Sequence, residues 1–598
     1  MSVIVCKFGG TSVADVDRIR NVAQRLVERK RAGHDVVAVV SARGDKTDEL
    51  LTLAAQITAD PPKRELDMLL TTGEQEAVAL VSMAVHSLGQ PAVSLIAPQI
   101  GMVTDRAHTK AKLLSISTER IRAELEKGNI VIVAGFQGVD TELNLTTLGR
   151  GGSNLTAVAL AAALDAEVCE NYTDVNGIYT CDPNVVPDAR KLQAISYDEM
   201  LELTSLGASV LQSRSVEFAK KYNVPIEVRS SFSDEPGTMV IGNVPGMENV
   251  YARGVALNRK EAKVTILDVP DRPGIAAHIL NGIVSQNISV DMIIQNASHA
   301  GHTDLTFTVM KTDLKEALAT VNALAGQVGA SDVIYDDKVA KLSVVGLGMR
   351  NHSGVAHRMF RALADRGINI QTISTSEIKI SCLIADEQAV EAARAVHHAF
   401  QLHRATPVED RDIRKVPTPP RTEGQSDLTE LLDAEVQRLK GMEDIVVLTA
   451  EAIRQEAKVT LTAVPDRPGV AAEILAPLAE QGVGLNVILQ NVSRQGVTDV
   501  TMTVLREDLQ RAVGAAREAC KRVGGRNVVA DSSIATLSIV GIGMRSHTGI
   551  GARMFAALAE AGVNIQMIST SEIKIACIIE EAQAGRALAA VKKAFSLR

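Results

Sequence analysis

A long internal repeat constrains the fold of this chain more than any other feature of its sequence. QTISTSEIKI at residues 371–380 recurs as QMISTSEIKI at residues 566–575, with one letter changed. The same shift of 195 positions aligns residues 247–403 with residues 442–598 without an insertion or deletion. Self-similarity over such a length is the signature of a duplicated structural block. We therefore interpret the C-terminal part of the chain as two copies of one block.

Each block contains a weaker repeat, at a shift of 80 positions, between segments such as RPGIAAHIL and HSGVAHRMF. Alternating segments such as KVTILDV predict strands, and IAAHILNGIVSQ carries apolar residues at helical spacing. The resulting order is that of a ferredoxin-like βαββαβ sandwich. We expect four such domains, at 247–337, 338–403, 442–532 and 533–598, with a charged, proline-rich linker at 404–441.

The first 240 residues follow a different pattern. Apolar runs such as VIVCKF, VVAVVS and IVIVAGF alternate with amphipathic stretches such as VDRIRNVAQRLVERK. Continuous apolar strands separated by helices predict an α/β domain over residues 1–240, with a mostly parallel sheet sandwiched by helices. A phosphorylated ligand is expected at the carboxyl ends of such strands.

Composition excludes several classes of function. The net charge of −8 and an aromatic content of 3% without tryptophan argue against a nucleic-acid partner. The sequence has no apolar run long enough to span a membrane and no signal-peptide pattern, so we expect a cytoplasmic protein. The six cysteines show no metal-ligand spacing, and His397 and His398 lie in an amphipathic helix, where we expect solvated surface. No metal site is predicted from protein ligands.

The hexapeptide KFGGTS at residues 7–12 follows one predicted strand and precedes a helix. Paired glycines let the backbone approach a ligand, a helix N-terminus favours anions, and Lys7 adds a positive charge. These features are typical of a phosphate cradle, and a plain strand-to-helix turn is the alternative.

Two further loops carry polar groups. TTLGRGGSN at residues 146–154 places glycines around Arg150, which can hold a carboxylate by two hydrogen bonds, but it matches neither GxGxxG nor a P-loop. NYTDVNGIYTCDPN at residues 171–184 suits a ribose, a base or a metal-bound phosphate, with a turn-rich loop as the alternative. TTGEQEA at residues 71–77 puts Glu74 at an expected helix start, where a capping role is the alternative.

Taken together, these motifs occur in the order seen in aspartate kinases, and the repeated blocks with VPDRPG and ISTSEIKI resemble the ACT regulatory domains of that family. The resemblance covers essentially the whole chain. It implies the amino acid kinase fold followed by four ACT domains. It also implies transfer of the γ-phosphate of MgATP to the side-chain carboxylate of L-aspartate, feedback inhibition by lysine, threonine or both, and a homodimer.

The resemblance also assigns residues. Lys7, Arg150 and Asp174 match catalytic positions, Arg150 as a carboxylate clamp, and Glu74 would face the α-amino group of aspartate. The matching nucleotide positions are Lys7, Gly9, Gly10, Ser41, Thr173, Asp174, Tyr179 and Asp182. The matching aspartate positions are Thr47, Glu74, Arg150, Gly151, Gly152 and Ser153.

For the ACT domains, the resemblance implies an amino-acid effector between two domains. The first block would contribute Asp271, Gly274, Ile275, Ala276, Asp291 and Gln295, faced by Asn369 and Ile370. The 195-residue shift carries this set to Asp466, Gly469, Val470, Ala471, Asn486 and Gln490. Because Asp291 becomes Asn486, we expect the two blocks to differ in ligand preference or affinity, with the first the better site. The alternative is a second block that serves only dimer packing.

Five positions depart from the usual family pattern: Arg43, Asn154, Asn176, Asn184 and Ser209. They leave two alternatives to an active aspartate kinase. The chain could be an amino-acid-sensing protein with an inactive kinase-like domain, or a sister kinase for another carboxylate such as glutamate.

Overall fold

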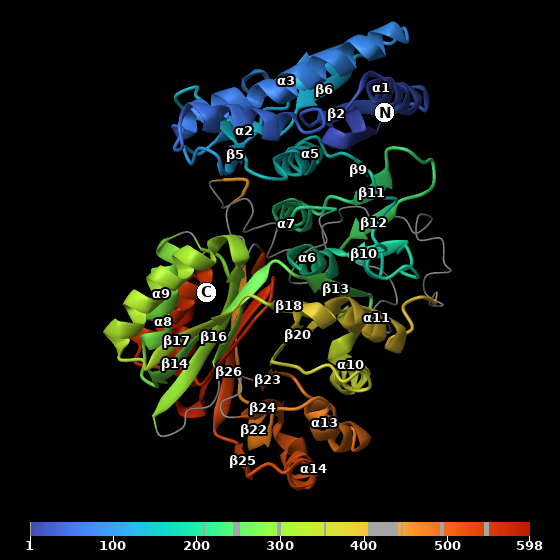
Figure 1. The fold of residues 1–598 in the computed structure, drawn as a ribbon. Coiled ribbons are helices and arrows are strands. Elements are labelled where there is room, and N and C mark those ends of the chain that lie inside the picture. Colours follow the sequence, from blue (N-terminus) through green and yellow to red (C-terminus); the bar gives the residue numbers. More distant parts are fainter. Residues whose placement is uncertain are drawn as a thin grey trace.

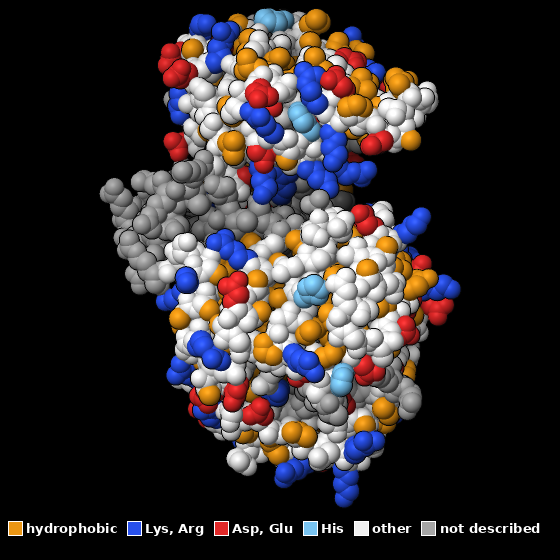
Figure 2. All heavy atoms as spheres, turned by 90° about the vertical axis from the view of Figure 1, so that its left-hand side faces the viewer, with side chains coloured by type: hydrophobic (Ala, Val, Ile, Leu, Met, Phe, Trp, Pro, Cys, Tyr) orange, Lys and Arg blue, Asp and Glu red, His pale blue; other side chains and the backbone are white. Residues whose placement is uncertain are grey.

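A computed structural model describes residues 2–206, 210–242, 251–286, 288–295, 301–351, 354–404, 441–443, 446–490, 496–542, 544 and 549–597. Figure 1 shows an N-terminal α/β unit above a C-terminal assembly of four smaller domains. None of the helices within the described residues is long and apolar enough to cross a lipid bilayer. Figure 2 shows acidic and basic side chains mixed over one face, with Lys and Arg gathered at the lower margin of the N-terminal unit.

The N-terminal unit is built on an eight-stranded sheet in the order β10-β12-β11-β9-β1-β2-β6-β3. All of its strand pairs are parallel except β11 with β12. The mostly parallel sheet expected from the apolar runs is therefore confirmed. The strands are β1 (Val3–Phe8), β2 (Asp35–Val40), β3 (Ala92–Leu95), β6 (Ile130–Ala134), β9 (Val168–Thr173), β10 (Ala194–Ser196), β11 (Ile226–Ser230) and β12 (Thr238–Ile241).

Apolar side chains project from both faces of the strands, so both faces of the sheet are covered by helices. Ile4, Cys6 and Phe8 of β1 pack in one core with α1 (Val16–Arg31) and α3 (Lys63–Ser87). Val5 joins the opposite core with α5 (Gly152–Ala163) and α7 (Ser213–Tyr222). Lys7 follows the Val5 direction, so it leaves the central strand on the α5 side, near its carboxyl end.

Smaller elements surround the sheet edge. The short strands β4 (Val103–Thr104), β5 (Leu113–Ser115), β7 (Gln137–Val139) and β8 (Leu145–Thr147) form a separate four-stranded sheet. The helices α2 (Lys46–Ile57) and α4 (Glu119–Glu126) lie between sheet strands in the sequence, and α6 (Tyr197–Ser205) precedes α7.

Domains 1 and 3 of the C-terminal assembly have the expected βαββαβ order. Domain 1 consists of β14 (Glu261–Pro270), α8 (Ile275–Ser285), β15 (Val290–Gln295), β16 (His302–Met310), α9 (Leu314–Val328) and β17 (Asp332–Asp336). Domain 3 consists of β22 (Glu456–Pro465), α13 (Val470–Glu480), β23 (Ile488–Gln490), β24 (Val497–Leu505), α14 (Leu509–Val523) and β25 (Asn527–Asp531).

Domains 2 and 4 each take their last strand from the segment before the preceding domain. β13 (Gly254–Asn258) pairs with β18 of domain 2, although its residues fall within the range expected for domain 1. β21 (Val446–Ile453) pairs in the same way with β26 of domain 4. The rest of domain 2 is β18 (Val339–Val345), α10 (Val355–Ala364), β19 (Thr372–Thr375), β20 (Lys379–Ala385) and α11 (Ala389–Ala399); that of domain 4 is β26 (Ile534–Ile542), α15 (Ile550–Glu560), β27 (Met567–Thr570), β28 (Lys574–Glu580) and α16 (Ala584–Ala594).

The four domains pair across the two blocks. β19 of domain 2 joins β23 of domain 3 in antiparallel register, with Ile373 opposite Gln490, and so forms a continuous eight-stranded sheet. Domain 1 lies beside domain 4, with β15 against β27. Within each block, the two domains contact each other through β14 and β18 or through β22 and β26. Each block therefore finds its edge-to-edge partners in the other block.

The repeated ISTSEIKI phrase forms a hairpin in each block rather than the single strand that its alternation suggests. The N–H group of Ser376 donates to the carbonyl of Lys379, and Ser571 donates in the same way to Lys574. The two hairpins meet, because the Ser569 hydroxyl donates to the Thr375 carbonyl at 2.8 Å. Each copy of the phrase therefore packs against the copy in the other block.

Candidate active site

Loops that follow the carboxyl ends of β1 and β2 meet at one edge of the sheet. A Cβ atom added to Gly10 would lie 2.8 Å from the carbonyl oxygen of Ala42, which is closer than a side chain tolerates. The N–H group of Ser41 donates to the Phe8 carbonyl at 3.1 Å. Glycine at position 10 is therefore required by the approach of the second loop, as well as being suited to a phosphate.

Lys7 lies beside the backbone of the same glycine-containing turn. A Cβ atom added to Gly9 would lie 3.4 Å from the Lys7 ammonium nitrogen. Desolvation of this ammonium lowers the pKa of Lys7 to about 8, although Cys169 and Asp174 act in the opposite direction. A negatively charged ligand would therefore stabilise the ammonium form of Lys7, which burial disfavours in the free protein.

Glu74 does not lie at the helix start where the sequence predicted it. Its position therefore also excludes the alternative role as a helix cap. It lies in the middle of α3, eleven residues after Lys63, and is only 3% exposed. One carboxylate oxygen, Oε1, accepts a hydrogen bond from the Ala42 N–H group at 3.1 Å. The other, Oε2, is buried without a hydrogen-bond partner among the described residues.

This burial has an electrostatic consequence. Desolvation raises the pKa of Glu74 to about 7, and the hydrogen bond from Ala42 offsets only part of that effect. A buried carboxylate oxygen without a partner is costly unless a ligand supplies a donor. The position of Glu74 beside the first two loops therefore suits the ammonium group of a substrate.

The glycine-rich loop places Arg150 at the surface, directly before α5. Gly151 has a φ of +73°, a conformation that favours glycine, and a Cβ atom there would lie 2.9 Å from the Gln212 side chain. Gly152 begins α5, and Ser153 is buried against Gly135 at the end of β6. The N-terminus of α5 is thus fixed at the same sheet edge, while Arg150 is exposed.

The loop after β9 carries the expected nucleotide residues. Thr173 is the last residue of β9, and its hydroxyl donates to the exposed carboxylate of Asp174 at 3.1 Å. Tyr179 forms an isolated bridge with Lys191 further along the loop. The Asp182 carboxylate accepts hydrogen bonds from the backbone and side chain of Asn184, at 2.9 and 3.0 Å. Asn184, which departs from the family pattern, therefore stabilises the turn that contains Asp182.

The remaining expected residues have less specific surroundings. Thr47 lies in the first turn of α2 and is half-buried. Asn176 donates to Glu235, and the Oδ1 atom of Asn154, in the first turn of α5, is buried without a partner among the described residues. Ser209 lies outside the described residues.

The first expected effector loop is paired differently from the expectation. Asp271 accepts a hydrogen bond from the Asn564 side chain at 2.8 Å, and the Gln295 side chain donates to the Ile565 carbonyl at 3.0 Å. These groups line a small pocket of about 20 Å³ between domains 1 and 4, together with Gly274, Ile275 and Ala276. The facing residues are therefore those of the second block.

Asn369 and Ile370, which were expected opposite Asp271, complete the other pocket. The Asn369 side chain donates to Asp466 at 2.9 Å, and the Gln490 side chain donates to the Ile370 carbonyl at 3.2 Å. This pocket, of about 10 Å³, also contains Gly469, Val470 and Ala471 and lies between domains 2 and 3. The expected pairing within one block is wrong because β19 pairs with β23 and not with β15.

Asp291 and Asn486 lie outside both loop pockets. Asp291 forms a buried ion pair with Lys341 of domain 2, and Asn486 donates to Glu456. The expected place of Asp291 among the effector residues of the loop pocket is therefore not supported by its position. The Asp-to-Asn difference changes the contact between the two domains of a block.

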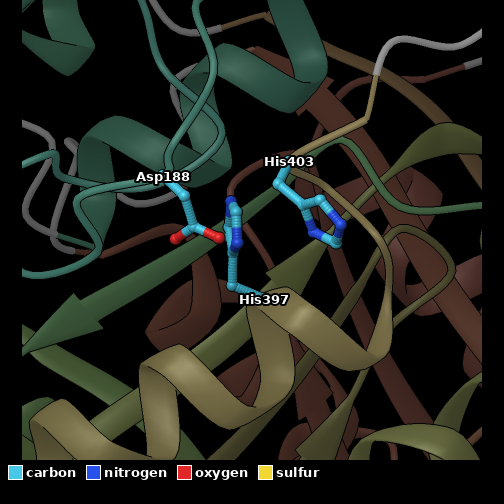
Figure 3. A group of neighbouring side chains, drawn as sticks. All are labelled: Asp188, His397 and His403. Atoms are coloured by element: carbon cyan, nitrogen blue, oxygen red, sulfur yellow. The ribbon is translucent and has the colours of Figure 1, made fainter.

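The expectation for His397 is wrong. It is fully buried on α11, and its Nε2 atom lies 2.9 Å from the Thr180 hydroxyl. Figure 3 shows its ring next to Asp188 of the N-terminal unit and His403. His398 is exposed, as expected. The reason for the difference is that this end of α11 packs against the loop after β9 instead of facing solvent.

The sequence motifs do not include Asn564, Ile565 or the N–H group of Ala42. Asn564 and Ile565 stand 195 positions after Asn369 and Ile370, so the repeat itself could have identified them. The Ala42 N–H group carries no side-chain signal, because a backbone donor is available at almost every position.

Comparisons with known proteins agree with this architecture. A model of the amino acid kinase family matches residues 2–230, and models of the ACT domain match residues 263–326, 342–400 and 537–595. An aspartokinase of Mycolicibacterium smegmatis is 52% identical over 407 residues, which are 67% of this chain and 97% of that protein. An aspartokinase of Pseudomonas aeruginosa is 53% identical over 404 residues, 67% of this chain and 98% of the relative.

Two solved structures extend the comparison. The aspartate kinase from Synechocystis is 39% identical with a TM-score of 0.52, and the match covers 100% of this chain and 98% of that one. Aspartokinase III of E. coli, solved in complex with aspartate and ADP, shares the fold at 24% identity with a TM-score of 0.58, over 66% of this chain and 99% of that one. Because the chain spans nearly the full length of relatives that are 52–53% identical to it, it belongs to the aspartokinase family.

Proposed function

We propose that this protein is an ATP-dependent aspartate kinase that phosphorylates the side-chain carboxylate of L-aspartate and forms 4-phospho-L-aspartate and ADP. The observation that carries the proposal is Glu74, a buried carboxylate with one unpartnered oxygen beside the Lys7 and Ala42 loops. The ammonium group of an amino acid substrate can pair with the Glu74 carboxylate, and anionic groups bound beside it can pair with Lys7. Family membership makes aspartate the substrate to test first.

Substrate positioning follows from the charges. Glu74, once ionised, accepts a hydrogen bond from the α-ammonium group of aspartate. Arg150 is exposed at the start of α5, where its guanidinium can clamp a carboxylate as the ligand binds. Thr47, Gly151, Gly152 and Ser153 supply the remaining hydroxyl and N–H donors of the proposed aspartate site.

Phosphoryl transfer then needs no covalent group from the protein. The attacking carboxylate is already ionised, so positioning and charge neutralisation carry most of the catalysis. Lys7 supplies a positive charge to the transferring phosphoryl group, and Gly9 and Gly10 let the backbone approach it. A negatively charged phosphate would restore the pKa of Lys7 toward its usual range, so the lysine binds ATP in its cationic form.

ATP is proposed to lie on the side of the loop after β9. Ser41, Thr173, Asp174, Tyr179 and Asp182 are the proposed nucleotide-side residues. The exposed carboxylate of Asp174 is a hard oxygen donor of the kind that Mg²⁺ prefers. When bound, Mg²⁺ would supply charge neutralisation on the phosphates.

The two loop pockets are proposed as effector sites for lysine, threonine or both. Each has an aspartate, Asp271 or Asp466, and the N-terminus of a helix, α8 or α13, which suit the ammonium and carboxylate of an amino acid. Since both loops keep this aspartate, both pockets remain candidates for binding. A homodimer remains a prediction.

The test is formation of the acyl phosphate itself. The full-length protein is incubated with MgATP, L-aspartate and hydroxylamine, which traps an acyl phosphate as a hydroxamate, and L-glutamate replaces L-aspartate in a parallel reaction. We expect aspartyl hydroxamate and little or no glutamyl product. A preference for glutamate would indicate the sister kinase.

The second candidate is an amino-acid sensor with an inactive kinase-like domain. It is favoured by Asn184, which occupies the Asp182 carboxylate with two hydrogen bonds and replaces a cation usual in the family. Formation of neither hydroxamate, together with saturable binding of lysine or threonine, would support the sensor.

A further inference from the structure

A cavity of about 200 Å³ lies between domains 2, 3 and 4, away from both loop pockets. Its walls are largely apolar and include Val355, Ile378 and Leu475. Two charged features line it: Glu456, and the Glu377–Lys574 ion pair between the two ISTSEIKI hairpins. An apolar cavity with a few placed charges is the usual form of a small-molecule site.

The other half of the assembly shows what belongs beside this glutamate. Glu261, 195 positions before Glu456, forms an ion pair with the ammonium group of Lys341, which is 1% exposed. The same ammonium also pairs with Asp291. A primary ammonium on an aliphatic chain thus fills this position in the first block.

The second block has lost that cation. Lys341 corresponds to Thr536, and Asp291 corresponds to Asn486. Glu456 is 4% exposed and accepts hydrogen bonds from the Asn486 side chain and the Thr536 hydroxyl, both at 2.6 Å. Within the described part of the chain, these neutral groups are its hydrogen-bond partners, and no Lys or Arg forms an ion pair with it.

The space follows the same substitutions. The corresponding cavity beside Asp291 measures about 80 Å³, against about 200 Å³ beside Asn486. A threonine side chain is shorter than a lysine side chain, so this replacement leaves more room next to Glu456 and accounts for part of the difference. The second block therefore combines a buried carboxylate, a missing ammonium and the room for a ligand that carries one.

We propose that this cavity binds a small aliphatic compound with a terminal primary ammonium group, such as a diamino acid, and that this terminal ammonium pairs with Glu456. A carboxylate on the same ligand would face Lys574 at the hairpin junction. The apolar walls would cover the aliphatic part. This site is separate from the two loop pockets, and its occupancy does not depend on the proposed kinase activity.

The cavity also adjoins the contact with the N-terminal unit. Ser571, Ile573 and Lys574 line it, and the N–H group of Glu572 between them donates to Glu202 on α6 at 3.0 Å. A ligand held against the second hairpin therefore lies within a few residues of the kinase domain. Binding there would favour whichever arrangement of the hairpin contacts it better.

The test measures binding to the full-length chain by calorimetry, with L-lysine as the probe and L-norleucine, which lacks the side-chain ammonium, as the matched ligand. Two variants remove the proposed site: Glu456→Gln, which deletes the charge, and the double variant N486D/T536K, which restores the triad of the first block. Glu560→Gln, at an exposed position on α15, is the control.

We expect the wild type and the control to bind one more molecule of L-lysine per chain than the double variant. Glu456→Gln should weaken that site by roughly 10- to 100-fold, as expected for a lost charged hydrogen bond. Norleucine should bind it more weakly than lysine. Equal stoichiometry and affinity in all four proteins, or no binding of L-lysine to the wild type, would overturn the proposal. The double variant keeps the paired chemistry of the first block, so a folded protein is expected.

A second, independent cluster lies where α11 meets the loop after β9. One ligand atom from each of Asp188, His397 and His403 lies within 4.8 Å of the other two. The Nδ1 atoms of both histidines are buried without a hydrogen-bond partner among the described residues. Figure 3 shows the three side chains converging from the N-terminal unit and from domain 2.

This arrangement points to a divalent metal site, and we infer that it binds Zn²⁺. Imidazole nitrogens and a carboxylate are common zinc ligands, and the Thr180 hydroxyl on Nε2 fixes the His397 ring with Nδ1 toward the cluster. The positions 195 residues later are Lys592 and Arg598, so the sequence of the second block does not repeat these histidines. A bound metal would link domain 2 to the proposed nucleotide-side loop.

The test uses the full-length protein purified with Zn²⁺ and passed through a desalting column, with metal content read by elemental analysis. We expect about one zinc per chain in the wild type and in His86→Ala, and its loss in His403→Ala. His403 is partly exposed, so this change should leave the fold intact. Zinc content that is equal in His403→Ala and the wild type, or absent from the wild type, would overturn the inference.

Discussion

At the scale of single residues, Glu74 and Lys7 have the surroundings that most specifically indicate a binding site. Both are charged groups that the protein desolvates, and their pKa values move toward each other, to about 7 and about 8. A protein gains little from such groups in isolation, because burial opposes their charged forms. Their cost is explained if the ammonium group of one substrate binds beside Glu74 and the phosphates of the other bind beside Lys7.

Replacing Glu74 by glutamine should weaken aspartate binding. Glutamine keeps the shape and can keep the contact with Ala42 only through its carbonyl oxygen, but it removes the charge that attracts the ammonium group. We expect kcat/KM for aspartate to fall by roughly 10- to 100-fold, while the melting temperature stays the same or rises because a buried charge is lost. Steady-state kinetics and a thermal melt measure both.

The matched control is Glu76→Gln, two residues along α3, where the carboxylate pairs with Arg43 and is partly exposed. Its effect on aspartate kinetics should be small. Similar losses in the two variants would show that the helix, and not the Glu74 carboxylate, determines aspartate binding.

The same two pKa values predict a narrow pH profile for kcat/KM when both aspartate and ATP are kept below saturation, because kcat/KM then reports the free enzyme. Glu74 must be ionised to accept the ammonium, so activity should fall as the pH drops below about 7. Lys7 must be protonated to bind phosphate, so activity should fall as the pH rises above about 8. In Glu74→Gln the acidic limb should disappear and the basic limb remain; an unchanged acidic limb would refute its assignment to Glu74.

At the scale of elements, the two ISTSEIKI hairpins connect the ACT domains to each other and to α6. Lys379 at the start of β20 pairs with Glu202 of α6 at 2.7 Å, and both side chains are almost fully buried. Burial alone would lower the pKa of Lys379, but Glu202, Asp291 and Glu572 raise it. Beyond α6, which packs against α7, the side chain of Gln212 directly before α7 lies against Gly151 of the glycine-rich loop.

Lys379→Met should destabilise the protein because it leaves Glu202 buried without its cation. Breaking a buried ion pair costs about 3–5 kcal/mol in the free energy of unfolding. Lys574→Met, at the equivalent position of the second hairpin, removes a cation whose partner Glu377 is 40% exposed, so we expect a smaller loss of about 1 kcal/mol or less. Chemical denaturation of both variants distinguishes the two cases; equal losses would contradict this view of the hairpins.

At the scale of the whole molecule, the duplication lets one chain supply both members of each ACT pair. Each loop pocket takes its acidic loop from one block and its facing asparagine from the other. The match to the aspartokinase of Mycolicibacterium smegmatis extends over 407 residues, 67% of this chain. The second block therefore occupies edges of the first that would otherwise be exposed strands.

This arrangement predicts how a shortened chain, residues 1–403, behaves. Without β23 and β27, the edges of β19 and β15 lose their partners, and both loop pockets lose half of their residues. We expect the shortened chain to self-associate through these edges, with more chains per particle than the full-length protein in analytical ultracentrifugation. An unchanged number of chains per particle would argue against the cross-block pairing.

The sequence predicted the kinds of domain well and their pairing poorly, for a physical reason. Apolar periodicity identifies strands and helices, and the 195-residue repeat identifies the two blocks. The repeat also makes the edges of β15 and β23 alike. Pairing of β19 with either edge therefore fits the sequence pattern equally well, and the full set of tertiary contacts decides between them. Glu74 and His397 were misplaced because their burial depends on Ala42 and Thr180, which lie far away in the sequence.

The most direct test of the central claim is the initial rate of ADP release by the full-length protein with MgATP, with and without L-aspartate. We expect aspartate-dependent release in the wild type and a loss of about 100-fold or more in Lys7→Ala, because the cation proposed to lie next to the transferring phosphate is gone. ADP release that does not depend on aspartate, or that survives unchanged in Lys7→Ala, would contradict it.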